Sequence, residues 1–399
     1  MKRILIISCV FPPEPIVSAQ LSLDVASELS KENSVVVLSP KPTRPENFIF
    51  EKINTVNSFE HIITGSYTYP KSKLTGRMHE SYSFGKHCAA YISNNFKNIS
   101  VIYLNSWPLL SQFLIIKTAK KYNLPCVTHV QDIYPESITN KLPFAKSLFY
   151  YLLLPIDKFV LRNSSVVLCI SENMKNQLQS TRKIPSERFE VVANWQNEDS
   201  FIQYKKSKKE RNSSNIKPFT FMYLGNNGPV AGVEFLIKSF YRAAIPDSQL
   251  IIAGSGSKTN DCKKMASNLE AKNIIFIPVP EGKVPETQDM ADIMLLPVKK
   301  NGAMSSIPSK LPAYMFSAKP IIGSLDLESN TAQAITDANC GIVVEPENED
   351  LLVKAMKDIT SWDKKELIEK GLNGFNYAME KFSRENNLKK IIEIISKVK

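Results

Sequence analysis

Short apolar runs rich in β-branched residues alternate with stretches of helical periodicity along the whole chain. A first series of strands is predicted at residues 4–9, 34–39, 101–105, 125–130, 165–171 and 189–194. A second series is predicted at residues 219–225, 249–256, 273–278, 292–298, 320–324 and 341–346. Between strands the pattern turns helical, as at residues 18–31, where Leu21, Val25 and Leu29 share one face. This alternation is typical of parallel sheets built from strand–helix–strand units.

A polar and basic run without periodicity, residues 204–217, separates the two series and is predicted to be a linker. The pattern therefore predicts two Rossmann-like, doubly wound α/β domains facing a cleft, with the ligand at the carboxyl ends of the strands. The expected boundaries are an N-terminal domain at 1–203, the linker, and a C-terminal domain at 218–375. A helical segment at 376–399 is expected to pack back on the N-terminal domain.

Composition narrows the class of protein. The chain has 399 residues, 43% of them hydrophobic, which is enough for two cores. Its net charge of +11 suggests an anionic partner, which charge alone leaves open among nucleic acid, anionic lipid and a phosphorylated substrate. Six scattered cysteines without a C-x-x-C motif are typical of reduced core residues in a cytoplasmic protein. None of the four histidines forms a ligand pair with a cysteine at zinc-finger spacing, so no structural metal is expected. We expect no cofactor either.

The first apolar run ends at Pro12-Pro13-Glu14-Pro15 without a small-residue cleavage site behind it. We therefore expect a first β-strand here and no signal peptide. No stretch approaches the roughly 20 apolar residues that a membrane-spanning helix needs.

A Ser-Lys pair, Ser309-Lys310, lies between Pro308 and Pro312 after the strand predicted at 292–298. Proline is tolerated only in the first turn of a helix, so Ser309 is predicted as the N-cap and Pro312 as the third helical residue. Free amides at Lys310 and Leu311, the Ser309 hydroxyl and the lysine would then form an anion site suited to phosphate. The alternative is that Ser309 is an ordinary cap and Lys310 a solvated side chain.

Several motifs occur in a specific order and spacing over nearly the whole length. They are FPPEP (11–15), QDIYPES (131–137), SENMKNQL (171–178), VVANW (191–195), YLGNNGPVAGVEFLIKSF (223–240), IIAGSGS (251–257), SIPSKLPAYMFSAKPIIGS (306–324) and CGIVVEPEN (340–348). In these motifs the chain resembles the glycosyltransferases of family 4, with the B-type fold, that assemble bacterial O-antigen, capsule or other surface polysaccharide. The resemblance implies a retaining, metal-independent transfer of a hexosyl or N-acetylhexosaminyl group from a nucleoside diphosphate sugar, with UDP favoured over GDP. It assigns acceptor binding to the N-terminal domain and nucleotide-sugar binding to the C-terminal one.

The same resemblance implies a donor site in the second domain. Its expected residues are Gly225, Asn226, Asn227, Gly228, Gly254, Ser255, Gly256, Ser306, Ile307, Ser309, Lys310 and Leu311. Lys310 is expected to be catalytic, because it would stabilise the charge that develops on the departing diphosphate. The glycines would let the backbone approach the phosphates. GSGS at 254–257 also follows a strand, but without a third glycine it is only a weak dinucleotide motif.

The chain departs from the family pattern at two places. Relatives often carry two glutamates eight positions apart across this helix start, where this chain has Ser305 and Ala313. Many also carry an arginine and a lysine that contact the donor diphosphate, where this chain has Asn226 and Ala231. Lys310 then remains as the obvious positive charge for the diphosphate.

The acceptor side is expected around the strand at 125–130. Asp132 and Glu136 follow this strand, and either is a candidate catalytic group that accepts a proton or orients a hydroxyl; Asp132 is equally well placed to cap the next turn. His129 and Gln131 share one face of the strand and are candidate acceptor contacts, although a lone strand histidine is more often packed core. Two further candidates, Ser18 and Gln20, lie at the start of the helix predicted after the first strand.

The resemblance implies a polyprenyl-diphosphate-linked saccharide as acceptor, and hence a cytoplasmic protein that is peripheral at the inner face of the cytoplasmic membrane. Two stretches, 66–87 and 144–162, are candidates for that contact, with a buried helix as the alternative for the second. Nucleic acid is not expected as a partner, since no nucleic-acid-binding module accompanies the charge.

Two other functions stay open. A nucleotide-sugar 2-epimerase has the same two-domain fold, but it needs catalytic carboxylates and histidines in the cleft, and the chain has few histidines. A non-catalytic partner in a polysaccharide assembly complex would fit the missing glutamates and the missing cations.

Overall fold

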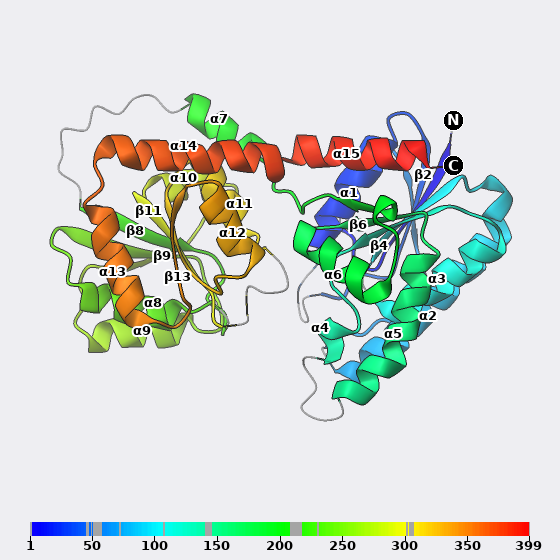
Figure 1. Ribbon diagram of the computed structural model, residues 1–399, viewed down its shortest axis with the longest axis horizontal. Coiled ribbons are helices and arrows are strands. Elements are labelled where there is room, and N and C mark those ends of the chain that lie inside the picture. The colour runs from blue at the N-terminus through cyan, green and yellow to red at the C-terminus, as the bar shows by residue number, and fades with distance from the viewer. Residues whose placement is uncertain are drawn as a thin grey trace. The chain divides into compact units, whose positions relative to one another are not determined.

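The structure is a computed structural model that describes residues 2–44, 48, 50, 58–71, 73–106, 108–139, 146–207, 218–229, 231–300, 302 and 307–398 (Figure 1). The chain divides into two compact units, Met1–Asn194 with Asn387–Lys399 and Trp195–Asn386. Each is an α/β domain around a parallel sheet. None of the helices in these ranges is both long enough and apolar enough to cross a bilayer.

The sheet of the first unit has the order β3-β2-β1-β4-β5-β6-β7 among the described residues, and all its strand pairs are parallel. Its strands are β1 (Arg3–Ser8), β2 (Ser34–Ser39), β3 (Glu60–Ile63), β4 (Val101–Ser106), β5 (Cys126–Val130), β6 (Val166–Cys169) and β7 (Phe189–Val191). Its helices are α1 (Val17–Leu29), α2 (Leu74–Asn95), α3 (Leu109–Lys121), α4 (Glu136–Thr139), α5 (Lys146–Arg162) and α6 (Glu172–Arg182), with 3-10 turns at Phe96–Asn98 and Ser186–Arg188.

The sheet of the second unit has the order β10-β9-β8-β11-β12-β13, again with parallel pairs throughout the described ranges. Its strands are β8 (Phe219–Leu224), β9 (Ser248–Ala253), β10 (Ile274–Ile277), β11 (Ile293–Pro297), β12 (Ile321–Ser324) and β13 (Gly341–Val344). The helices are α7 (Asp199–Ser207), α8 (Val233–Ala243), α9 (Thr259–Asn268), α10 (Val284–Asp289), α11 (Lys310–Phe316), α12 (Asn330–Asp337), α13 (Glu349–Thr360) and α14 (Lys364–Lys381).

The predicted strands are all present, and the expected doubly wound architecture is confirmed in both units. Most of the strands are rich in apolar residues and largely buried, because helices cover both faces of a parallel sheet; all five residues of β5, for example, are buried. The sequence prediction missed β3. This edge strand has only four residues and a half-exposed, partly polar sequence, so it carries no strand signal of its own.

The unit boundaries differ from the expected ones. Residues 195–203 group with the second unit because α7 packs there, with the Phe201 and Phe316 rings 5.8 Å apart and the Tyr204 hydroxyl donating to Asp289 at 2.9 Å. Residues 204–207 of the expected linker complete α7, and the remaining ten, 208–217, lie outside the described residues.

The C-terminal residues from 387 onward, in α15 (Arg384–Lys397), belong to the first unit. There the Lys390 Nζ donates to the Val191 carbonyl at 2.9 Å, and the Lys2 Nζ donates to the Ser396 carbonyl at 2.8 Å.

In each sheet the strand order reverses beside the first strand, between β1 and β4 and between β8 and β11. Ligands of open α/β sheets bind at such a reversal, outside the carboxyl ends of the strands. In the second unit, α11 follows β11 and is backed by α14 (Figure 1). Gly371 of α14 rests against the backbone that follows α11, where a Cβ would clash with the Ala318 carbonyl oxygen. Gly371 therefore sets how closely α14 supports α11.

We expect Gly371→Ala to destabilise the second unit. Alanine is the better helix former by about 1 kcal/mol, but the added methyl has no space against the Ala318 carbonyl, so the clash outweighs the propensity. Hydrogen-exchange mass spectrometry in urea measures this unit separately from the first. The exposed Glu369→Ala in the same helix is the control and should leave the exchange unchanged; equal protection in both variants would contradict the prediction.

Candidate active site

Two loops at the carboxyl edge of the second sheet are packed backbone to backbone. Gly225, after β8, donates to the Ala253 carbonyl at 3.0 Å, and Asn227 donates to the Ser255 carbonyl at 3.0 Å. A Cβ at Gly254 would lie 2.5 Å from the Gly225 carbonyl oxygen, and a Cβ at Gly256 would lie 2.6 Å from the Asn227 nitrogen. These glycines are needed because any side chain would separate the two loops.

The Lys310 side chain crosses this packed backbone. Lys310 is the first residue of α11, and a Cβ at Gly225 would clash with its Cε. The Nζ lies 5.6 Å from the centroid of the Tyr223 ring, within the range of a cation–π contact. Burial lowers the pKa of the Lys310 ammonium from its ordinary value. The structure therefore brings Lys310 together with the predicted donor-loop residues Gly225, Asn226, Asn227, Gly228, Gly254, Ser255 and Gly256 at one edge of the sheet.

Two tyrosines that the sequence reasoning missed hold this arrangement. The Tyr314 hydroxyl donates to the Leu224 carbonyl at 2.8 Å and accepts from the Leu224 amide at 3.0 Å. The Tyr223 hydroxyl donates to the Asn226 carbonyl at 2.7 Å. Both tyrosine side chains are fully buried. The sequence did contain a signal for them: Tyr223 lies in a mostly apolar strand and Tyr314 in a mostly apolar helix. A tyrosine hydroxyl buried in such a place requires a hydrogen-bond partner.

The helix start at Lys310 follows the prediction in position but not in hydrogen bonding. Ser309 precedes the first helical residue and Pro312 is the third, as expected. Ser309, however, has αR backbone angles and its side chain caps no amide. The Leu311 amide is not free, because it donates to the Pro308 carbonyl at 3.0 Å, and the Leu311 side chain is core. The predicted phosphate-binding amide of Leu311 is therefore wrong. Of the other expected donor residues, Ile307 is half-buried and Ser306 lies outside the described residues.

A cavity of about 290 Å³ lies at the start of α8 on the same edge of the second sheet. Its lining includes Gly228, Gly232, Lys258 and Lys299. Lys258 is held by Asp261 at 2.9 Å and Glu234 at 3.8 Å, whereas Lys299 forms no ion pair with any residue that the structure describes. Lys238 lines the same cavity, also without an ion pair among the described residues, and Glu347 is a further lining residue, so the cavity is bordered by charges of both signs.

In the first unit, His129 is a core residue. Its side chain is fully buried in β5, and its Nδ1 lies 2.8 Å from the Tyr103 hydroxyl. Burial lowers the pKa of His129 to about 4, so the ring is neutral at physiological pH. The prediction of His129 as an acceptor contact is wrong, because a fully buried ring cannot reach a ligand.

The two carboxylates after β5 have different surroundings. Glu136 accepts two hydrogen bonds from the Arg182 guanidinium, at 2.8 and 2.6 Å, while the Arg182 Nε donates to Asp157 at 2.8 Å. Arg182 is fully buried and also donates to the Tyr134 carbonyl. A guanidinium that donates to both oxygens of a carboxylate fixes the position of that carboxylate. Glu136 therefore anchors the turn after β5 to α6, and its predicted catalytic role stays a prediction beside that of the half-buried Asp132.

Of the remaining predicted acceptor residues, Ser18 and Gln20 are accessible, whereas Gln131 is buried. The Gln131 Oε1 accepts from the Asn194 Nδ2 at 2.8 Å, while its buried Nε2 has no acceptor among the described residues. Gln20 is exposed and donates to Asp24 at 3.0 Å, and Ser18 is half-buried near the start of α1. In the described ranges, no group of three or more histidine, cysteine, aspartate or glutamate side chains is placed to hold a metal ion.

Comparison with known families covers both units. Residues 19–199 match the model of the family described as Glycosyltransferase Family 4, and residues 205–372 match that of Glycosyl transferases group 1. The chain belongs among the glycosyltransferases. No curated protein matches its sequence.

Solved structures show the fold of this glycosyltransferase. HepE of Anabaena in complex with UDP is 13% identical, with 99% of this chain and 100% of that chain covered and a TM-score of 0.67. Sucrose-phosphate synthase of Thermosynechococcus elongatus is 14% identical over 99% and 98% of the two chains, with a TM-score of 0.71. WaaG, a glycosyltransferase involved in lipopolysaccharide biosynthesis, is 15% identical over 99% and 100%, with a TM-score of 0.66. The expected two-domain B-type architecture is thereby confirmed.

We expect His129 to make the stability of the glycosyltransferase pH-dependent. Its pKa is about 4 in the fold against an ordinary 6.5, so below pH 6.5 the unfolded chain takes up the proton first. The free energy of unfolding should then fall by about 1.4 kcal/mol per pH unit towards pH 4. His129→Gln keeps a hydrogen-bonding side chain that does not titrate. Urea unfolding of the first unit at pH 7 and pH 5 should show wild type losing more stability than the variant, and parallel losses would contradict the assignment.

Proposed function

We propose that this glycosyltransferase transfers a sugar from a UDP-linked donor to a lipid-linked saccharide during assembly of a surface polysaccharide, with retention of configuration and without a metal. The observation that carries the proposal is the half-buried Lys310 ammonium lying over the Gly225 backbone at the strand reversal of the second sheet. The UDP and UDP-glucose complexes of HepE and the lipopolysaccharide role of WaaG support the nucleotide and the pathway class.

Charge stabilisation is the chemical reason for the proposal. Negative charge grows on the diphosphate as the bond to the sugar breaks, so a fixed cation there lowers the barrier most. The Lys310 ammonium is partly removed from water, which strengthens its attraction for an anion. Because Gly225 has no side chain, the Lys310 side chain lies close to its backbone, and a phosphate can approach the same backbone.

Lys299 is a candidate for a second cation in the same transfer. The arginine and lysine that many relatives place after the first strand of this domain are replaced by Asn226 and Ala231. The cavity at the start of α8 places Lys299 beside Gly228 of the donor loop. The lysine side chain is exposed and long enough to follow a bound diphosphate.

On the acceptor side, we assign the orienting role to Asp132 and further contacts with the acceptor to Gln131, Ser18 and Gln20. Gln20 is the most exposed of the three, and Gln131 has an amide donor without an acceptor among the described residues. The lipid anchor of the acceptor implies that the enzyme works peripherally at the inner face of the cytoplasmic membrane.

We expect Lys310→Ala to lower turnover by about 10²- to 10³-fold, because it removes the cation that faces the leaving diphosphate. The assay incubates the protein and bacterial membranes with radiolabelled UDP-sugars and follows label into extracted lipid. Lys300→Ala, an exposed neighbour outside the site, is the matched control and should transfer at the wild-type rate. Wild-type turnover in Lys310→Ala would remove the proposed role, and interconversion of free UDP-sugars without an acceptor would favour epimerisation.

We expect the profile of kcat/KM against pH to fall on its alkaline side below 10.5, the ordinary lysine pKa. Burial disfavours the ammonium form of Lys310 in the free enzyme, so its proton is lost at a lower pH than from an exposed lysine. Lys310→Arg stays charged throughout the measurable range. In the Lys310→Arg variant, kcat/KM should therefore no longer fall at alkaline pH, even if its value is lower throughout. If kcat/KM of the variant falls with the same midpoint pH as wild type, the fall belongs to another group.

A further inference from the structure

Helix α5 of the first unit exposes an apolar face. Leu148, Tyr151 and Leu152, spaced as one face of a helix, are 69%, 71% and 64% exposed. We call these three residues the α5 face. The alternative of a fully buried helix is wrong for this half of α5, although Val160 and Leu161 in its second half are core.

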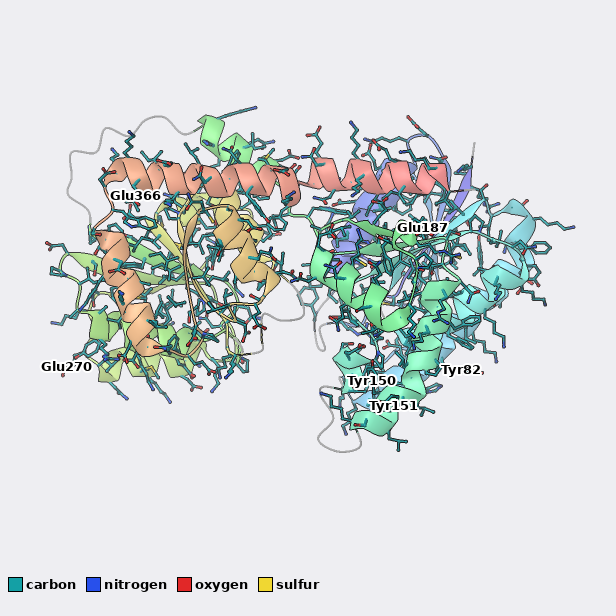
Figure 2. The ribbon with its side chains drawn as sticks, in the orientation of Figure 1. Tyr82, Tyr150, Tyr151, Glu187, Glu270 and Glu366 are labelled. Atoms are coloured by element: carbon teal, nitrogen blue, oxygen red, sulfur yellow. The ribbon has the colours of Figure 1, made fainter. Side chains whose placement is uncertain are left out.

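Exposed apolar residues also occur on a helix of the same layer as α5. α5 packs on α3, and α3 packs on α2, so the three helices form one layer (Figure 1). Exposed Met78 and Tyr82 of α2 belong to the same layer, and Figure 2 shows Tyr82 on α2 and Tyr150 and Tyr151 on α5. A helix that is apolar on both its packed side and its outer side requires a second partner.

The charges of α3 and α5 indicate what kind of partner this is. Both helices are basic, with Lys117, Lys120, Lys121, Lys146, Lys158 and Arg162. Their only acidic residue, Asp157, is buried in its ion pair with Arg182 and shows no charge to the surface. The two helices therefore carry a net positive charge, with Lys146 in the same half of α5 as the α5 face.

We propose that the α5 face docks on a lipid bilayer that contains anionic lipids. Leucine side chains would enter the boundary of the acyl chains, Tyr151 would lie at the headgroups, and the lysines would contact lipid phosphates. The inference deepens the proposed function and rests on it in one respect, that a lipid-linked acceptor brings the enzyme to a membrane. The docking surface itself rests on the exposure and charge of α5.

Vesicle co-sedimentation tests the proposal on the full chain. Wild type should sediment with phosphatidylcholine vesicles containing about 30% phosphatidylglycerol, bind pure phosphatidylcholine weakly, and lose binding as salt is raised. The combined variant Leu148→Ser, Tyr151→Ser, Leu152→Ser should bind anionic vesicles at least about tenfold more weakly. The matched control Leu327→Ser, Ile368→Ser, Leu372→Ser removes three exposed apolar residues of the second unit and should bind as wild type does.

Three outcomes would overturn the docking surface. The first is that wild type stays in the supernatant with anionic vesicles. The second is that the Leu148, Tyr151, Leu152 variant sediments as wild type does. The third is that light scattering finds wild type and the control variant as dimers and the Leu148, Tyr151, Leu152 variant as a monomer. The last would assign the α5 face to a second copy of the chain.

UDP titration calorimetry separates this inference from the proposed function. The serine variant should bind UDP as wild type does, which also shows that it is folded. A wild type that docks on vesicles but does not bind UDP would overturn the proposed function and leave the docking surface standing.

Discussion

The second unit depends on a close approach between a lysine and a peptide backbone. Lys310 lies over Gly225, and Gly225 in turn packs on the backbone of Gly254, so two loops and one helix meet where no side chain fits between them. The tyrosine hydroxyls of Tyr223 and Tyr314 hydrogen-bond the same backbone and fix its position. An ammonium held in this way is placed before any substrate arrives, and such preorganisation makes electrostatic stabilisation effective.

A second helix, α14, supports the helix that carries Lys310. Helix α14 packs on α11 through Gly371, whose missing side chain lets the two helices approach at Ala318. The position of Lys310 therefore follows from a chain of contacts running from α14 through α11 to the loop after β8. Glycines at both ends of this chain serve the same purpose, which is close approach of backbone.

The first unit uses its buried charges differently. Arg182 is shared between Glu136, Asp157 and the Tyr134 carbonyl, which ties the turn after β5 to α5 and α6. A buried guanidinium is tolerated only with such complete pairing, because each unpaired partner would cost several kcal/mol. The same pairing occupies both carboxylate oxygens of Glu136. On α5, this network holds the inner side of the helix in place while its outer apolar side stays exposed.

The sequence by itself determined the elements and the class of protein. Continuous apolar runs predicted the buried strands, because parallel sheets are covered on both faces, and Pro312 fixed the start of α11. Motif order indicated a glycosyltransferase, and residues such as Lys310 and Gly225 were found from their motifs. Only the tertiary structure decided the environment of each side chain. The burial of His129, the pairing of Glu136 with Arg182 and the hydrogen bond from the Leu311 amide to Pro308 all depend on neighbours that the local pattern does not specify. The exposure of Leu148, Tyr151 and Leu152 also depends on neighbouring elements. An apolar helix has the same sequence pattern whether its outer face contacts protein or lipid.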